Sequence, residues 1–386
     1  MPNPSAGANP LEQCTEEELR RRGGLKWNTH PPDVLPLWVA EMDVPLADCV
    51  TAALRQAVER GDTGYPGDAE DYAAAMAGFA RDRWGWSPPA GRATAVPDVM
   101  RGIVAVLEAV TAPGDAVVVS PPVYPPFARF AALAGRRVVA APLGPAHRLD
   151  TRALEEAFAE ATRDGRPAVY LLCNPHNPTG TVHTAAELTE LAALARAHRV
   201  RVVADEIHAP LVLPGARHVP YLSLPGTEGD FALLSAAKAW NVSGLGAALL
   251  VRGAQCADLP PEAAHGTGRL GVLAQTAALR TGGDWLDALL RGLDANRRLL
   301  TELVADRLPA VRYRTAEGTY LAWLDFRQTG LGDDPAAVLL DRARTALTSG
   351  AAFGTGGAGH ARLNFAASAQ TLTRAVEAMA RVTGSA

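Results

Sequence analysis

The sequence is almost without lysine. Only Lys26 and Lys238 are lysines among its 37 basic residues, and the remaining 35 are arginines. Alanine, glycine and proline are abundant, a bias typical of a GC-rich genome that uses arginine wherever only charge is needed. Arginine cannot replace lysine in Schiff-base chemistry, because that chemistry needs a primary amine that can lose its proton. The two lysines are therefore candidates for a chemical role, with chance survival as the alternative.

Other missing patterns exclude further classes of protein. The four cysteines, at positions 14, 49, 173 and 256, form no C-x-x-C pair, and the nine histidines show no metal-ligand spacing, which argues against a disulfide framework or a zinc site. No apolar run approaches the ~20 residues of a membrane helix, and the first residues lack the features of a secretory signal. The net charge of -4 favours neither nucleic acid nor an anionic membrane as partner. We therefore expect a cytoplasmic protein without a metal ion.

The length of the chain and the order of its elements predict two associated domains. A chain of 386 residues exceeds what one hydrophobic core usually serves. From about residue 50, short apolar runs alternate with helical stretches, which indicates a mostly parallel sheet with helices on both faces. Two later strands bracket one helix, and a last helix closes the chain, as in a smaller α+β domain. The predicted parts are an N-terminal arm belonging to the small domain (1–45), a large domain (46–275) and a C-terminal small domain (276–386).

Polar side chains follow the predicted strands of the large domain. The strands are expected at 116–120, 168–173, 200–204, 231–234 and 247–251. The residues after the first four are Tyr124, Asn174, Asn177, Asp205, Glu206, His208, Ser235 and Lys238. Ligands of open α/β sheets bind beyond the carboxyl ends of the strands, so these side chains should converge. An amine, an acid, an amide, a hydroxyl and an aromatic ring match the needs of a phosphorylated pyridine aldehyde.

Seven short motifs occur in a fixed order and cover nearly the whole chain from Lys26 onward. They are Lys26-Trp27, Leu35 to Asp43, Thr63 to Tyr65, Asn174 to Gly180, Asp205 to His208, Ser235 to Lys238 and Arg362 to Phe365. Each motif is weak alone, but their ordered conjunction resembles the fold-type-I pyridoxal-phosphate enzymes, and among them the cystathionine β-lyases of the MalY/PatB type. The resemblance implies the fold-type-I transferase fold, an α/β fold with a large, mostly parallel sheet flanked by helices and a smaller α+β domain.

The resemblance implies pyridoxal 5′-phosphate as the cofactor. Lys238 would hold it as a Schiff base and, once freed by the substrate, would take the Cα proton. Asp205 would keep the pyridine nitrogen protonated, and Asn177 would bond the phenolic oxygen. Tyr124 would stack on the ring. His208 stands where many relatives carry a tyrosine that faces the same oxygen. His208 would either contact this oxygen directly or lie behind the residues that do.

The resemblance also implies a phosphate site. Ser235 and the backbone amides of Gly102 and Ile103 would hold the phosphate, the two amides at a helix N-terminus whose dipole favours anions. Tyr65 would reach the phosphate from a second subunit. The resemblance therefore implies a homodimer with shared active sites.

The substrate site would involve three further assignments. Arg362 would bind the substrate carboxylate through two parallel hydrogen bonds, and Asn177 and Trp38 would also contact the substrate. The motif G-x-G-x-x-G at 354–359 is not a dinucleotide site, because a strand follows it where a helix is needed. It is interpreted as a loop that delivers Arg362.

The reaction is less closely defined by the motifs than the cofactor. Gly246 stands where many fold-type-I enzymes have a phosphate-binding arginine, and Trp240 replaces a commoner phenylalanine. The resemblance implies a carbon–sulfur β-lyase that converts cystathionine or an S-substituted cysteine to a thiol, pyruvate and ammonia. The alternatives are an aminotransferase, an enzyme that decarboxylates and oxidatively deaminates an S-cysteine conjugate, and a regulator that uses the fold for protein contacts. An intact Lys238, Asp205 and Arg362 argue against loss of catalysis.

Overall fold

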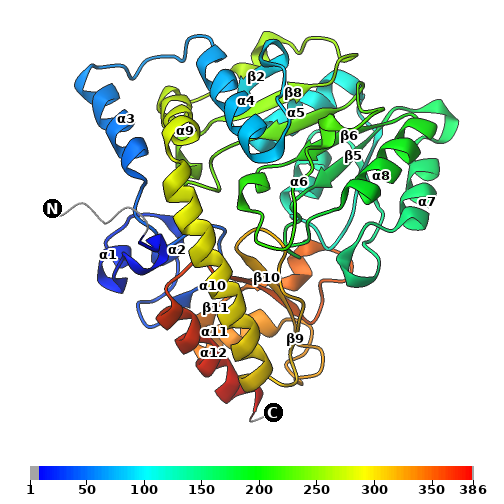
Figure 1. Ribbon diagram of the computed structural model, residues 1–386. Helices are drawn as coiled ribbons and strands as arrows, with labels where there is room; N and C mark the ends of the chain where they lie inside the picture. The colour runs from blue at the N-terminus through cyan, green and yellow to red at the C-terminus, as the bar shows by residue number, and fades with distance from the viewer. Residues whose placement is uncertain (1–7, 385–386) are drawn as a thin grey trace.

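The computed structural model describes residues 8–384, which form a seven-stranded, a four-stranded and a two-stranded sheet, with helices packed around them (Figure 1). The helices are α1 (Glu16–Arg20), α2 (Leu25–Asn28), α3 (Asp48–Glu59), α4 (Glu70–Trp84), α5 (Val99–Val110), α6 (Pro126–Leu133), α7 (Thr151–Ala161), α8 (Ala185–Ala197), α9 (Arg269–Thr281), α10 (Gly283–Arg307), α11 (Pro335–Ala343) and α12 (Ala369–Thr383). The strands are β1 (Leu35–Pro36), β2 (Ala93–Val96), β3 (Ala116–Val119), β4 (Arg137–Ala140), β5 (Ala168–Cys173), β6 (Val200–Asp205), β7 (Phe231–Leu234), β8 (Ala248–Arg252), β9 (Arg312–Tyr313), β10 (Leu321–Asp325), β11 (Thr345–Ala346), β12 (Thr348–Ser349) and β13 (His360–Asn364).

The large sheet has seven strands in the order β2-β8-β7-β6-β5-β3-β4. Only β8 runs opposite to the other six strands, so the prediction of a mostly parallel sheet is confirmed. The strands predicted at 116–120, 168–173, 200–204 and 231–234 appear as β3, β5, β6 and β7 within one residue at each end. The edge strands β2 and β4, each only four residues long, were not predicted from the sequence.

The central strands are buried on both faces, which explains why their sequences are near-continuous apolar runs. Val117 and Val119 of β3 pack with α5 and α6 on one face. Ala116 and Val118 pack on the other face with residues of α7 and α8, including Phe158. Alternate residues of one strand therefore pack against helices on opposite faces of the sheet. This packing holds the strands, and the loops at their carboxyl ends, in position.

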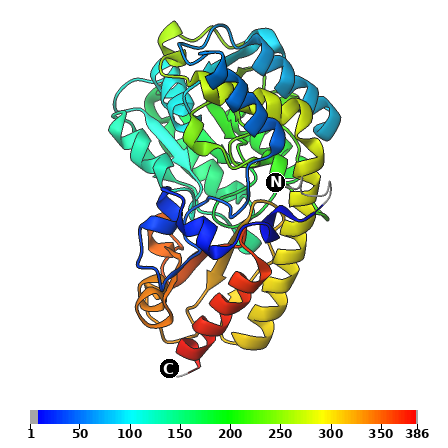
Figure 2. The ribbon, with the colours of Figure 1, turned by 90° about the vertical axis from the view of Figure 1, so that its left-hand side faces the viewer.

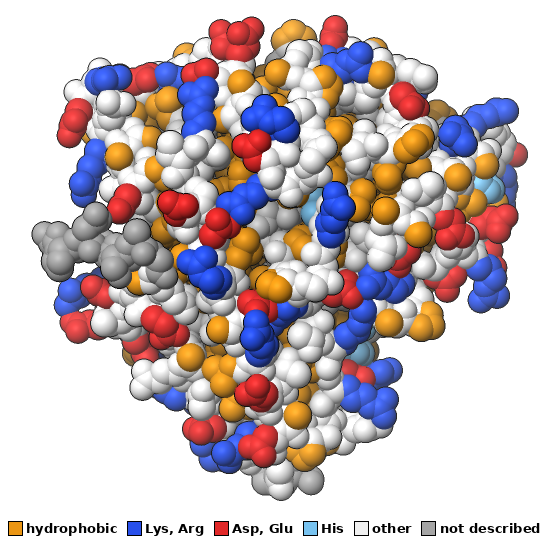
Figure 3. Space-filling model, viewed as in Figure 1, with side chains coloured by type: hydrophobic (Ala, Val, Ile, Leu, Met, Phe, Trp, Pro, Cys, Tyr) orange, Lys and Arg blue, Asp and Glu red, His pale blue; other side chains and the backbone are white. Residues whose placement is uncertain are grey.

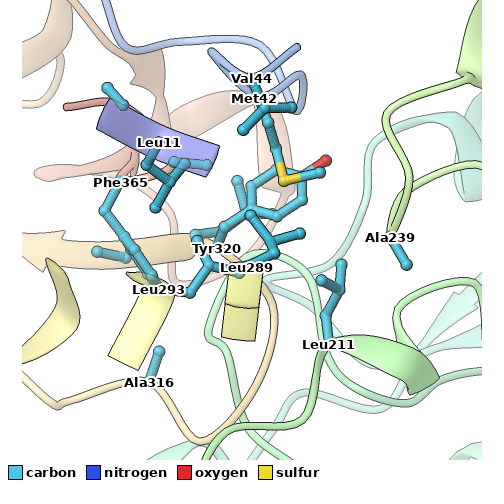
Figure 4. Close-up of a cluster of buried hydrophobic side chains, with 14 of the residues drawn as sticks. Leu11, Met42, Val44, Leu211, Ala239, Leu289, Leu293, Ala316, Tyr320 and Phe365 are labelled. Atoms are coloured by element: carbon cyan, nitrogen blue, oxygen red, sulfur yellow. The ribbon is translucent and has the colours of Figure 1, made fainter. Parts of the chain in front are cut away.

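The small sheet is antiparallel, in the order β12-β13-β10-β9. The helix α10 is 25 residues long and runs from the large sheet to the small one (Figures 1 and 2). Strand β1 of the arm pairs with β11, which ties the first residues of the chain to the C-terminal part. A buried cluster collects side chains from the arm, α10 and the small sheet, among them Met42, Leu293 and Tyr320 (Figure 4).

The surface and the helices agree with an ordinary globular protein. Acidic and basic side chains are interspersed on the face drawn in Figure 3. Within residues 8–384, no helix is long and apolar enough to cross a membrane, and no cluster of three or more potential metal ligands is found. A capping box at Thr184 and Glu187 starts α8, with Thr184 Oγ1 accepting from the Glu187 amide and the Glu187 carboxylate accepting from the Thr184 amide at 2.7 Å.

Candidate active site

A cavity of about 390 Å³ opens at the carboxyl ends of the central strands. Its lining includes seven of the residues predicted to form the site: Tyr124, Asn177, Asp205, His208, Ser235, Lys238 and Arg362. They come from segments as far apart as 124 and 362, so the fold itself assembles them. The side chains of Trp38 and Tyr65 and the residues Gly102 and Ile103 do not line this cavity.

Lys238 follows β7 in the loop that begins at Ser235. Its amine donates a hydrogen bond to the carbonyl oxygen of Ala40 at 3.0 Å. Desolvation and the charge of Arg362 lower the pKa of Lys238 to about 8, against the opposing effect of Glu41 and Asp205. An amine with this pKa is partly neutral near pH 7, so it can act as a nucleophile or as a base.

Asp205 is the last residue of β6 and lies beside Cys173 of β5 in the sheet register. Burial raises the pKa of Asp205 to about 6, although the Ile207 amide donates to Oδ1 at 3.1 Å and the charge of Lys238 also favours ionisation. A buried carboxylate is costly unless a cation pairs with it. The position therefore suits a cationic group in the cavity, such as a protonated pyridine nitrogen.

Arg362 on β13 reaches across the cavity to the large sheet. Its Nη1 donates to Asn177 Oδ1 at 3.0 Å, and its Nη2 donates to the carbonyl of Trp38 at 2.8 Å and to Thr348 Oγ1 at 3.2 Å. The Nε atom is buried and has no partner among the described residues. Burial lowers the pKa of Arg362 to about 10, so the guanidinium stays charged at neutral pH. Its Nε therefore remains as a donor for a carboxylate.

The N-terminus of α5 lies at one end of the cavity. Val99 and Met100 line the cavity and occupy the first two positions of the helix. Amides at these positions have no acceptor within the helix, and the dipole makes them favourable to anions. The Asp98 side chain caps the helix by accepting from the Arg101 amide at 2.8 Å. These two amides are therefore the ones available to a phosphate group.

The prediction that Gly102 and Ile103 hold the phosphate is wrong. The Gly102 amide donates to the Asp98 carbonyl at 3.0 Å, and Ile103 lies one residue deeper in the helix, where the amide is also used. Gly102 has a packing role, because a Cβ atom there would lie 2.2 Å from Leu233 Cδ2. The prediction placed Gly102 and Ile103 at the N-terminus of a helix, whereas α5 starts at Val99, after the cap Asp98.

Ser235 is buried, and its hydroxyl is already engaged. Oγ lies 3.1 Å from the Ala247 carbonyl and 2.9 Å from Gln275 Oε1, and it accepts from the Ala237 amide. Gln275 was missed in the sequence. It also accepts from the hydroxyl of Tyr72 at 2.6 Å and holds the start of the lysine loop. A single glutamine inside α9 carries no motif that would reveal this position.

Tyr124 and His208 complete the walls of the cavity. Burial raises the pKa of Tyr124, so its phenol stays protonated. Burial and the charges of Lys238 and Arg362 lower the pKa of His208 to about 3, so the imidazole is neutral. Its Nδ1 atom is buried and has no hydrogen-bond partner among the described residues.

Two predicted residues lie elsewhere. The Trp38 ring is turned from the cavity, with Nε1 donating to the Lys26 carbonyl at 3.3 Å, and only its carbonyl contributes to the site by holding Arg362. Tyr65 lies between α3 and α4 and is 96% exposed. It borders a surface groove with the segment Pro261 to Arg269.

The donors and acceptors of the cavity fit pyridoxal 5′-phosphate. An amine with a lowered pKa faces the space, a buried carboxyl lies on the same sheet edge, and free amides mark the far end. The buried Arg362 Nε and His208 Nδ1 lack partners among the described residues. Such groups need a partner when the cavity closes around a ligand. In such a fit, the aldehyde would lie at Lys238, the ring nitrogen at Asp205, the phenolic oxygen at Asn177 and the phosphate at the amides of Val99 and Met100.

Comparison with known proteins identifies the class. Residues 33–379 match the family described as aminotransferase class I and II, and the chain belongs to this family, with the fold-type-I architecture. It is 54% identical to a Mycobacterium tuberculosis (strain H37Rv) protein provisionally named a cystathionine beta-lyase, over 97% of this chain and 98% of that one. The Corynebacterium glutamicum cystathionine beta-lyase is 36% identical over 95% and 98% of the two chains.

A solved structure supports the same placement. The chain matches a Corynebacterium diphtheriae protein, provisionally described as a PLP-dependent beta-cystathionase, with a TM-score of 0.88 and 33% identity over 96% of this chain and 98% of that one. Cystalysin from Treponema denticola, a structure that contains pyridoxal 5′-phosphate, superposes with a TM-score of 0.87 at 23% identity, covering 98% and 99%, and shows the shared fold.

Proposed function

We propose that this protein is a pyridoxal-phosphate-dependent carbon–sulfur β-lyase that acts on cystathionine or an S-substituted cysteine. The observation that carries the proposal is the meeting of Lys238, Asp205, Asn177 and Arg362 in one cavity. The relatives named as cystathionine beta-lyases, which match nearly the whole chain, favour β-elimination. The products would be a thiol, pyruvate and ammonia.

When bound, pyridoxal 5′-phosphate supplies an electron-withdrawing ring that stabilises negative charge on the substrate Cα. Asp205 would hold a proton on the ring nitrogen, which keeps the ring electron-poor. Asn177 would donate from Nδ2, because its Oδ1 is occupied by Arg362. The amides of Val99 and Met100 would bind the phosphate.

Arg362 and Lys238 would handle the substrate. Arg362 would offer its unpartnered Nε–H to the α-carboxylate, and its bonds to Asn177 and Trp38 hold the guanidinium in place. Lys238 would take the Cα proton, since its lowered pKa of about 8 keeps part of the amine neutral near physiological pH. The resulting ammonium then carries a proton that can be given to the departing sulfur.

An aminotransferase is the second candidate, because the family description covers that activity and the same residues would serve it. Decarboxylation with oxidative deamination of an S-cysteine conjugate, or a purely regulatory role, are the remaining alternatives. The test is incubation with cystathionine and S-alkyl cysteines, with pyruvate, free thiol and retained keto acid measured. Stoichiometric pyruvate and thiol support the lyase, whereas turnover that requires a keto acid acceptor supports the aminotransferase.

We further propose a homodimer in which Tyr65 of one subunit completes the phosphate site of the other. The exposure of Tyr65 supports this arrangement, since a tyrosine is rarely left so open on a monomer. The domain boundaries at 45 and 275 and a cytoplasmic location also stay predictions.

A further inference from the structure

The backbone carbonyl of Ala40 accepts hydrogen bonds from both the Lys238 amine and the buried Tyr320 hydroxyl. Lys238 Nζ and the Tyr320 hydroxyl each donate to the carbonyl oxygen of Ala40 at 3.0 Å. Tyr320 is fully buried, immediately precedes β10 and was not identified from the sequence. The two donors come from the large and the small sheet and meet on the N-terminal arm.

The segment 38–43 that carries this carbonyl is fixed on both sides. Asn364 Nδ2 donates to the carbonyls of Val39 and Glu41 at 2.7 and 2.6 Å. Asn241 pairs with the amide and the carbonyl of Met42 at 2.9 and 3.0 Å. The Ala40 carbonyl is therefore held in place without Tyr320, and loss of the phenol would not displace it.

Tyr320 is itself held firmly. Its ring is packed in the cluster of Figure 4 and meets the edge of His208 with ring centroids 6.0 Å apart. The preceding residue, Thr319, is fully buried and has a φ of 67°, a left-handed conformation that is rare for a β-branched residue. Strained backbone of this kind persists where the surroundings over-determine a position.

We propose that Tyr320 is a positioning residue that allows Lys238 to leave the Ala40 carbonyl. The inference rests on the proposed function, in which the amine of Lys238 becomes attached to the cofactor. Without Tyr320, the Ala40 carbonyl would have no donor once the Lys238 amine leaves. The cavity would then be filled and closed to water, and a buried group without a hydrogen bond is costly. Tyr320 remains bonded to the carbonyl throughout, so the amine can move between its resting and attached positions without this cost.

The test compares Tyr320→Phe with Tyr313→Phe. Tyr313 is a second tyrosine of the small sheet, and its phenolic oxygen accepts from the Ala316 amide at 3.2 Å rather than donating to the segment 38–43. Both substitutions delete one hydroxyl and keep the ring. The charged groups that face Lys238, namely Arg362, Glu41 and Asp205, are unchanged in both variants.

Apo-protein is titrated with pyridoxal 5′-phosphate, and covalent attachment is followed by absorbance. Tyr320→Phe should weaken attachment about ten-fold and move its pH midpoint upward, because the resting amine is favoured. The melting temperature of the apo form should change no more than in Tyr313→Phe. Attachment within two-fold of the unmodified protein, or equal weakening in both variants, overturns the inference alone. Failure of the unmodified protein to attach the cofactor at Lys238 overturns the proposed function, and the inference with it.

Discussion

The Nη1 atom of Arg362 lies 3.0 Å from Oδ1 of Asn177 and donates a hydrogen bond to it. A guanidinium has no acceptor, so the amide must present its oxygen to Arg362 and its NH₂ group elsewhere. The pair thereby joins the residue that would bind the substrate carboxylate to the residue that would bind the cofactor's phenolic oxygen. The orientation of one amide thus links the two halves of the site.

This relationship predicts a difference between two variants at position 177. Asn177→Asp keeps an acceptor for Arg362 but loses the donor and adds a negative charge that faces the phenolic oxygen. Asn177→Ala loses both bonds without adding charge. We expect kcat/KM for elimination to fall about 100-fold in the aspartate variant, because a hydrogen bond to a charged group is lost. In the alanine variant, KM should change more than the absorbance spectrum of the cofactor. An aspartate variant with unchanged kcat/KM and absorbance would refute the assignment.

The lowered pKa of Lys238 predicts how cofactor attachment depends on pH. Only the neutral amine reacts with an aldehyde, so the rate at which apo-protein takes up pyridoxal 5′-phosphate should rise with pH and level off above about pH 8. Stopped-flow absorbance between pH 6 and about 10 measures this rate. A rate still rising steeply near pH 10 would indicate an ordinary lysine. Lys238→Arg should show no attachment, and borohydride should label only the peptide that contains Lys238 in the unmodified protein.

Asp205 should have opposite effects on stability and activity. Burial raises the pKa of this carboxyl to about 6, so the folded apo-protein binds the proton more tightly than the unfolded chain does. The apo-protein therefore loses stability as the pH rises from about 4 to about 6, by about 3 kcal/mol in total. Asp205→Asn should make the apo-protein more stable at pH 7 and remove this dependence, while slowing Cα deprotonation at least 100-fold.

Chemical denaturation of both apo-proteins at pH 4 and pH 7 tests the first part. Exchange of the substrate α-proton in deuterated water tests the second, and it applies equally to a lyase and to an aminotransferase. If Asp205→Asn is destabilised at pH 7 and exchanges the proton at the normal rate, the carboxylate serves only as a structural partner of the Ile207 amide.

Tyr65 predicts that each site is built from two chains. Variants Tyr65→Ala and Lys238→Ala should be nearly inactive alone. Mixed under conditions of subunit exchange, half of the dimers become hybrids with one site that has both native residues, so about a quarter of the normal activity should return. Native mass spectrometry verifies that hybrids have formed. Hybrids without activity would place Tyr65 outside the partner's site.

The sequence was informative where chemistry follows the end of a strand. Asp205 and Lys238 could be placed because strands β6 and β7 are apolar runs whose ends share an edge. The phosphate amides were misplaced by one helical turn, because Asp98 is a cap without a glutamate three residues later and its helix seemed to begin at Gly102.

Gln275 and Tyr320 could not be found at all. Gln275 binds the site residue Ser235, and Tyr320 binds the Ala40 carbonyl to which Lys238 also donates. Both come from elements distant in the sequence, and neither residue type is unusual at its position. Their importance arises from tertiary packing, which local patterns do not encode.

The scarcity of lysine has a practical consequence for chemical labelling. Lys26 is only 1% exposed and forms an ion pair with Asp43 at 2.8 Å, so acylating reagents cannot reach it in the folded protein. Of the two lysine side chains, only Lys238 is then open to a small acylating reagent, because it lines the cavity. Amine-directed dyes would therefore report the sites in which Lys238 is not attached to the cofactor, and immobilisation through lysine would inactivate whatever it captured.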